Sequence, residues 1–96
     1  LVAISLIRRF GRDNAVFFYN KGVEVDFYIP EEEMAIQVSY STQDEDTRKR
    51  EVKALEALPK VLPCKHRYII TYDENDEWHL SDKDIEVIPV WKWLLQ

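Results

Sequence analysis

The sequence contains four polar residues whose types and spacing suit a hard divalent cation. They are Glu24 and Asp26 in one segment, and Gln37 and Ser39 in another. In each segment they alternate with apolar residues, as expected for β-strands with one apolar face. Carboxylate and amide oxygens bind Mg²⁺, and bound Mg²⁺ polarises a phosphate ester and acidifies water. These residues therefore suggest a site for one divalent metal ion, with Asp26, Glu24 and Gln37 as the candidate ligands.

A tight turn between the two segments brings these residues together. If residues 30–33 form the turn, antiparallel pairing places Asp26 opposite Gln37 and Glu24 opposite Ser39. Opposed residues have Cβ atoms roughly 5 Å apart, and residues two apart on one strand are about 6.7 Å apart. We therefore expect all four side chains to converge on one face of a hairpin.

The rest of the sequence predicts the elements that hold this hairpin. Helical spacing of apolar residues, with Gly11 and Pro59 as stop signals, predicts two helices, and Pro89 predicts the start of a third. Runs of β-branched and aromatic residues predict strands. The predicted order is helix 2–9, strands 15–20, 23–29 and 34–40, a helix capped by Thr42 or Asp44 and ended by Pro59, strands 66–73, 77–81 and 85–88, and a closing helix.

This order predicts an α/β or α+β sandwich in which helices flank a mixed central sheet that contains the hairpin. In the closing helix Trp91, Leu94 and Leu95 form an apolar stripe, which we expect to pack onto the body of the domain. The lone Cys64 is expected to be a small buried thiol.

Several motifs resemble a known family. The segments GVEVDFYIP, AIQVSYS, DEDTRKREVKALEAL and IEVIPVWKWLL, in this order, resemble the C-terminal domain of unknown function of bacterial and archaeal AAA-type ATPases. The hairpin in turn resembles the active site of the PD-(D/E)XK nuclease superfamily. The resemblance covers nearly the whole chain. It implies a restriction-endonuclease-like core in the order α-β-β-β-α-β-β-β-α, with residues 1–96 as one nuclease-like domain at the C-terminal end of a larger ATPase.

The sequence departs from the superfamily pattern at two positions. In that superfamily two carboxylates bind Mg²⁺, and a lysine positions water and stabilises charge. Asp26 stands at the first acidic position, but Gln37 replaces the second acid and Ser39 replaces the lysine. Deleting one such electrostatic contact commonly costs about 3 to 4 kcal/mol of barrier lowering. The resemblance therefore implies a degenerate site at Glu24, Asp26, Gln37 and Ser39, with no catalytic residue assigned.

Three interpretations of this site stay open. In the first, the four residues form an internal hydrogen-bonded cluster, and the domain is a non-catalytic accessory that engages a protein or nucleic acid. In the second, the domain is a Mg²⁺-dependent DNA nuclease in which Lys21, Arg48 or Lys49 supplies the missing cation. In the third, the site binds a metal or another ligand without hydrolysing anything. A toxin or defence partner domain is a further alternative for the function.

The composition of the chain limits the classes of partner and cofactor that we expect it to bind. The chain of 96 residues carries a net charge of −5, so we expect it to bind nucleic acid poorly by itself. The sequence has no long apolar run, and in LVAISLIRRF the arginines follow the apolar part, the wrong order for a signal peptide, so we expect a cytoplasmic protein with no membrane partner. Gly11 and Gly22 are the only glycines, so ATP binding is expected only in a separate ATPase domain, the expected intramolecular partner. His66 and His79 lie on separate predicted strands, which does not favour a zinc site.

Overall fold

A five-stranded mixed sheet forms the middle layer of this α+β domain in the computed structural model, which describes residues 2–11, 16–20, 24–40, 45–72, 80 and 82–95. The first three strands pair antiparallel, and the third, fourth and fifth pair parallel. The hairpin expected from sequence thus supplies the central strand. In spatial order the strands are β1 (Val16–Asn20), β2 (Glu24–Ile29), β3 (Met34–Ser39), β4 (His66–Thr71) and β5 (Ile85–Pro89).

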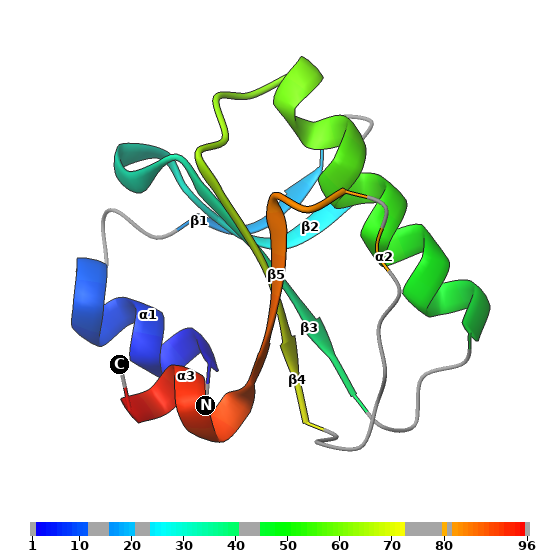
Figure 1. Cartoon of the computed structure of the whole chain (residues 1–96). Helices are drawn as coiled ribbons and strands as arrows, with labels where there is room; N and C mark the ends of the chain where they lie inside the picture. The colour runs from blue at the N-terminus through cyan, green and yellow to red at the C-terminus, as the bar shows by residue number, and fades with distance from the viewer. Residues whose placement is uncertain are drawn as a thin grey trace.

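Helices cover both faces of the sheet (Figure 1). Helices α1 (Val2–Phe10) and α3 (Val90–Leu95) lie on one face, and α2 (Glu45–Ala57) lies on the other. Each face has its own apolar core. The core under α1 and α3 contains Val2, Leu6, Ile29, Ile36, Val38, Ile70, Ile88 and Trp93. The core under α2 contains Val25, Tyr28, Ala35, Leu55, Leu58, Ile69 and Ile85.

Local sequence signals place most element ends correctly. Gly11 has φ 86°, and its N–H donates to the carbonyl of Ile7 at 2.9 Å, which ends α1 as expected. Pro59 lies in the short 3₁₀ segment η2 (Leu58–Lys60) that follows α2. The predicted strand 77–81 lies outside the described residues, except for Leu80.

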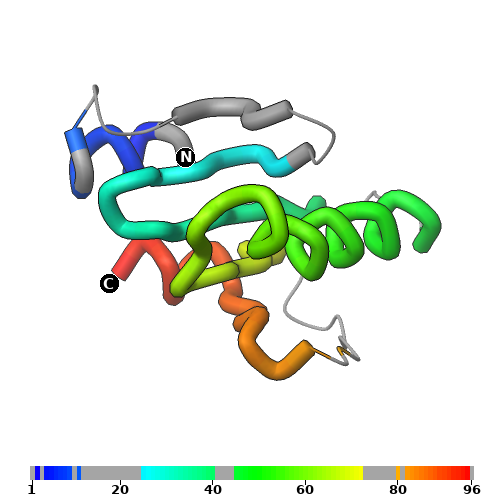
Figure 2. Tube along the Cα trace, turned by 90° about the horizontal axis from the view of Figure 1, so that it is seen from above, coloured from blue at the N-terminus to red at the C-terminus, as the bar shows by residue number. Residues whose placement is uncertain are grey.

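The turn of the β2–β3 hairpin has the predicted register, because Ile29 pairs with Met34. Its four residues comprise the 3₁₀ segment η1 (Pro30–Glu32) and Glu33, and Figure 2 shows the two strands joined there as a U. Glu33 adopts φ 50°, in the left-handed region. Its carbonyl accepts the N–H groups of Lys65 and His66, at 2.8 and 3.1 Å, so the turn is tied to the start of β4.

The expected packing of α3 is wrong. Trp91, Leu94 and Leu95 are exposed, and the buried residue of this helix is Trp93, at 2% exposure. The indole N–H of Trp93 donates to Ser5 Oγ at 3.0 Å, so the helix turns the tryptophan toward α1, where its polar atom finds a partner. Periodicity identified a stripe but not the face that the domain buries.

Two other expectations concern the burial of Cys64 and the absence of a membrane-spanning helix. Cys64 is half-buried rather than buried, and partial burial raises the pKa of its thiol. None of the helices in the described part of the chain has the length and apolar character needed to cross a bilayer.

Candidate functional site

Asp26 and Gln37 meet as the hairpin register predicts, and each side chain binds a backbone N–H of the other residue's strand. The N–H of Asp26 donates to Gln37 Oε1 at 2.9 Å, and the N–H of Val38 donates to Asp26 Oδ2 at 2.8 Å. Each side chain therefore takes the place of a backbone carbonyl on the opposite strand. We call this pair of bonds, between Asp26 and Gln37–Val38, the strand lock.

Helix α2 holds one half of the strand lock in place. Gln37 is 2% exposed, and its Nε2 lies 3.4 Å from the carbonyl oxygen of Glu51, to which it donates. The amide group of Gln37 thus reaches the helix on one side and the amide of Asp26 on the other. These two contacts orient the Oε1 atom of Gln37 toward β2.

Ser39, at the position of the superfamily lysine, is fully buried. In the described part of the chain its Oγ has no hydrogen-bond partner. Because a short, neutral side chain under α2 cannot extend a positive charge toward a phosphate, Ser39 does not replace the lysine. We expected Ser39 to form a hydrogen bond with a carboxylate of the hairpin, but the described side chains show no such bond.

The fourth predicted site residue, Glu24, opens β2 and pairs with Asn20 of β1. Its side chain lies outside the described residues, as does Lys21, one of the expected substitute cations.

Strand β2 departs from strict alternation next to the lock. Val25 and Tyr28 both pack in the core under α2, although alternation places them on opposite faces. Backbone pairing of β2 with β3 covers Phe27 to Ile29, and the side-chain bonds of Asp26 follow it. The simple two-face pattern therefore does not hold at the point where the Asp26 carboxylate accepts the Val38 N–H.

Burial raises the pKa of the Asp26 carboxyl above its usual value of 3.8, and the N–H of Val38 opposes this shift. Among the described residues no positive charge contributes to this shift of the pKa. The ion pairs within 4.0 Å in the described part of the chain do not include Asp26. On α2, Lys49 is exposed and Arg48 is half-buried, one turn before the Glu51 carbonyl that binds Gln37.

Replacing Asp26 separates the acceptor role of this carboxylate from its charge. A raised pKa means that the folded state favours the neutral acid, so stability falls as the pH rises through the folded-state pKa. Asp26→Asn keeps an oxygen for the Val38 N–H, and we expect it to be at least as stable as the wild type at pH 7. Asp26→Ala leaves that N–H unpaired and is expected to lose about 1 to 3 kcal/mol. Urea unfolding at pH 4 and pH 7 measures both effects; a much less stable Asn variant at pH 7 would show that the charge itself stabilises the fold.

The predicted metal ligands other than Glu24, whose side chain lies outside the described residues, fit Mg²⁺ poorly. Among the described side chains of the lock, Asp26 is the one anion, and the oxygens of Asp26 and Gln37 that face each other's strands already accept backbone N–H groups. Mg²⁺ demands carboxylate or water oxygens in near-ideal octahedral geometry. The described residues also contain no group of three His, Cys, Asp or Glu side chains placed to hold a metal.

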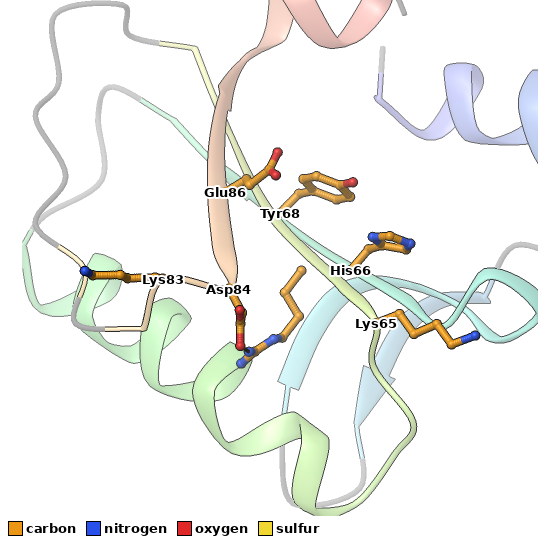
Figure 3. A pocket seen from close by; sticks show the side chains of 7 residues that line it. Lys65, His66, Tyr68, Lys83, Asp84 and Glu86 are labelled. Carbon is orange, nitrogen blue, oxygen red and sulfur yellow. Dashed lines mark ion pairs between the residues drawn. The ribbon is translucent and has the colours of Figure 1, made fainter.

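A second candidate is a groove of about 220 Å³ between β4 and β5 (Figure 3). His66 and Tyr68 stack along β4 with ring centroids 6.3 Å apart, and Glu86 on β5 lies on the same side. The groove is lined by Lys65, His66, Arg67, Tyr68, Lys83, Asp84 and Glu86. The groove is lined by side chains of both charges. Its buried cation, Arg67, already binds groups of the protein.

That buried cation, Arg67, is a residue that the sequence reasoning missed. Its guanidinium donates to the carbonyl of Leu55 in α2 at 2.9 Å and to both carboxylate oxygens of Asp82, at 2.8 and 3.4 Å. The Asp84 carboxylate lies 3.7 Å away. The signal was present, because an arginine inside the otherwise apolar run HRYIITY demands a buried partner. Arg67 thus joins α2, β4 and the segment before β5.

Comparison with known proteins adds one relative. No family model and no solved structure match this sequence. The uncharacterized protein MJ1544 of Methanocaldococcus jannaschii is 38% identical over 104 aligned residues, which cover 99% of this chain and 23% of the relative. This chain resembles one part of a longer archaeal protein. It spans about a quarter of the length of that curated relative.

Proposed function

We propose that this chain is a non-catalytic accessory domain of an AAA-type ATPase, with a nuclease-like fold whose active-site hairpin has become a structural element. The observation that carries this proposal is the strand lock. Asp26 and Gln37, at the two metal-binding positions of the superfamily pattern, bind backbone N–H groups of each other's strands. The function then lies in engaging a protein or nucleic acid under control of the ATPase.

The order of elements supports the nuclease-like part of this proposal. A helix, an antiparallel hairpin, a crossover helix and parallel strands follow one another in the described part of the chain, which includes only Leu80 of the strand expected at 77–81. The length of the M. jannaschii relative supports the accessory part, because three-quarters of that protein lies outside the aligned region.

Metal binding and cleavage, measured on the same samples, test the proposal. We expect calorimetric titration of Mg²⁺ and Mn²⁺ at millimolar concentration to give no heat of binding, and plasmid DNA to stay intact, for the wild type and for Asp26→Asn alike. This matched variant keeps the shape and the Val38 bond, so any difference reports the charge. Metal binding and cleavage by the wild type, both lost in Asp26→Asn, would replace this proposal by the nuclease.

The alternative, a Mg²⁺-dependent nuclease with a relocated cation, is favoured by one observation. Arg48 is one helical turn before Glu51, whose carbonyl binds Gln37 of β3, so this cation belongs to the part of α2 that contacts β3. If cleavage is found, Arg48→Ala should reduce its rate by roughly a few hundredfold, the value of one electrostatic contact to the transition state. Lys53→Ala, at an exposed position of the same helix and not among the candidate cations, is the control.

The ATPase part is tested on the longer relative. We expect the M. jannaschii protein to hydrolyse ATP, and to retain hydrolysis when the aligned quarter is removed. A protein without ATP hydrolysis in either form would contradict the assignment to this class of ATPase.

A further inference from the structure

Helix α3 presents an apolar stripe to solvent. Trp91, Leu94 and Leu95 lie at i, i+3 and i+4, so they share one side of the helix, and their exposed fractions are 51%, 42% and 80%. We call these three residues the α3 stripe. Trp93, on the opposite side, anchors the helix to the core. The helix is thus held in place by one tryptophan while it exposes another.

Exposed apolar side chains gather on this side of the molecule. The large apolar side chains exposed in the described part of the chain are Ile4, Tyr40, Val61, Trp91, Leu94 and Leu95. Four of these six belong to α1 and α3, the two helices on one face of the sheet (Figure 1). Apolar surface concentrated in this way marks an interaction site, whereas single exposed apolar residues need no explanation.

The two helices form one rigid support for such a site. The indole N–H of Trp93 donates to Ser5 Oγ, whose own hydroxyl donates to the Val2 carbonyl at 2.8 Å. The Arg9 guanidinium lies 4.4 Å from the centre of the Trp93 ring and donates to the Trp93 carbonyl. Because α1 and α3 are linked in this way, a partner on the α3 stripe contacts a preformed surface and orders little.

The chain connections indicate which partner this surface meets. Helix α1 begins and helix α3 ends on the same side of the sheet (Figure 1). Whichever end continues in a longer polypeptide, as in the M. jannaschii relative, the connected part follows a helix on the face of the sheet that carries α3. Its effective concentration there is high, so a modest apolar contact is enough for docking.

Exposed positive charge on α1 and α3 adds to this argument. Arg8 on α1 and Lys92 on α3 are both exposed, although the chain as a whole carries a net charge of −5. A complementary surface has an apolar centre and acidic groups at its rim.

We propose that the α3 stripe is the surface through which this domain docks on the remaining part of a longer polypeptide, the part that MJ1544 has beyond the aligned quarter. This inference rests on the accessory role proposed above and names the contact that serves it. The docked surface is apolar, centred on Trp91 and Leu95, and rimmed by acidic groups of the partner.

Binding in trans tests the proposal. The probe is MJ1544 without its aligned quarter, titrated with this chain by calorimetry, and the relative's own aligned quarter serves as the positive control. The double variant Leu94→Glu/Leu95→Glu is expected to weaken binding about tenfold or more. The control Val61→Glu, at a residue that is 52% exposed after η2, is expected to bind like the wild type. Urea unfolding checks that both variants are as stable as the wild type.

Three results would overturn the docking proposal. The first is absence of binding by the wild type, with or without binding by the relative's own quarter. The second is equal loss of affinity in the stripe variant and the Val61 variant. The third is a dimer of this chain in sedimentation that the stripe variant abolishes, since the occupant would then be a second copy. ATP hydrolysis by the probe is measured separately: a probe that binds through the stripe but lacks hydrolysis contradicts the ATPase assignment and leaves the docking surface supported.

Discussion

Replacing Trp93 by alanine is expected to lower the free energy of unfolding by about 4 kcal/mol. Trp93 is 2% exposed and packs in the core under α1 and α3, where the Tyr68 ring lies 5.7 Å away at an angle of 56°. Alanine leaves a cavity among side chains that cannot all collapse into it. It also removes the partner of Ser5 and the ring on which Arg9 stacks.

The neighbouring Trp91 provides a matched control for this loss. It lies on the same helix and is 51% exposed, so Trp91→Ala should change the free energy of unfolding by no more than about 0.5 kcal/mol. Urea unfolding followed by far-ultraviolet circular dichroism measures both. Because a small domain has only about 5 to 15 kcal/mol of stability, Trp93→Phe serves if the alanine variant does not fold, with an expected loss of roughly 1 to 2 kcal/mol. Equal losses at positions 91 and 93 would contradict the observed orientation of α3.

Arg67→Met is expected to cost about 3 kcal/mol at pH 7. Methionine keeps the length of the aliphatic stem but provides no donor for the Leu55 carbonyl, and it leaves Asp82 without its ion pair. Arg67 and Asp82 have side chains that are 8% and 24% exposed, so solvent screens their pairing only in part. Lys65→Met is the control, since Lys65 pairs with Glu33 at 3.5 Å but its side chain is 75% exposed; we expect a change within about 0.5 kcal/mol.

The cost of Arg67→Met should depend on pH in a definite direction. Hydrogen bonding from the Asp84 N–H, followed by the Arg67 guanidinium, holds the pKa of Asp82 below its usual value of 3.8. A lowered folded-state pKa means that the stabilisation is present above pH 3.8 and is lost as the pH falls through the folded-state pKa. The stability difference between Arg67→Met and the wild type should therefore shrink in acid. Unfolding curves at pH 7 and near pH 3 measure it, and a difference that is the same at both would indicate that the Leu55 bond alone accounts for the loss.

Local patterns in the sequence determined the elements and the register of the hairpin. Alternation and a four-residue turn placed Ile29 opposite Met34, and apolar spacing with Gly11 as a stop placed α1. These features depend on residues within a few positions of one another, because turn geometry and side-chain periodicity act along the chain. The meeting of Asp26 with Gln37 follows from the same register.

The tertiary structure decided how the polar side chains of that hairpin are used. The sequence placed Asp26, Gln37 and Ser39 on one strand face, which suits a metal site and a hydrogen-bonded cluster equally well. In the fold, α2 covers β3, so Gln37 binds the Glu51 carbonyl and Ser39 is buried. Residues 14 positions apart in sequence make the first of these contacts, and no local pattern encodes it.

Long-range packing also decided the roles of the two residues with the largest expected effects. Spacing within α3 identified an apolar stripe at Trp91, but the helix turned Trp93 inward because Ser5, 88 positions earlier, accepts its N–H. Arg67 likewise acquired its partners from α2 and from the segment before β5. A sequence determines which faces of an element are apolar through local periodicity. Which of those faces is buried depends on the shape and the polar partners that distant elements bring to it, and only the assembled fold contains that information.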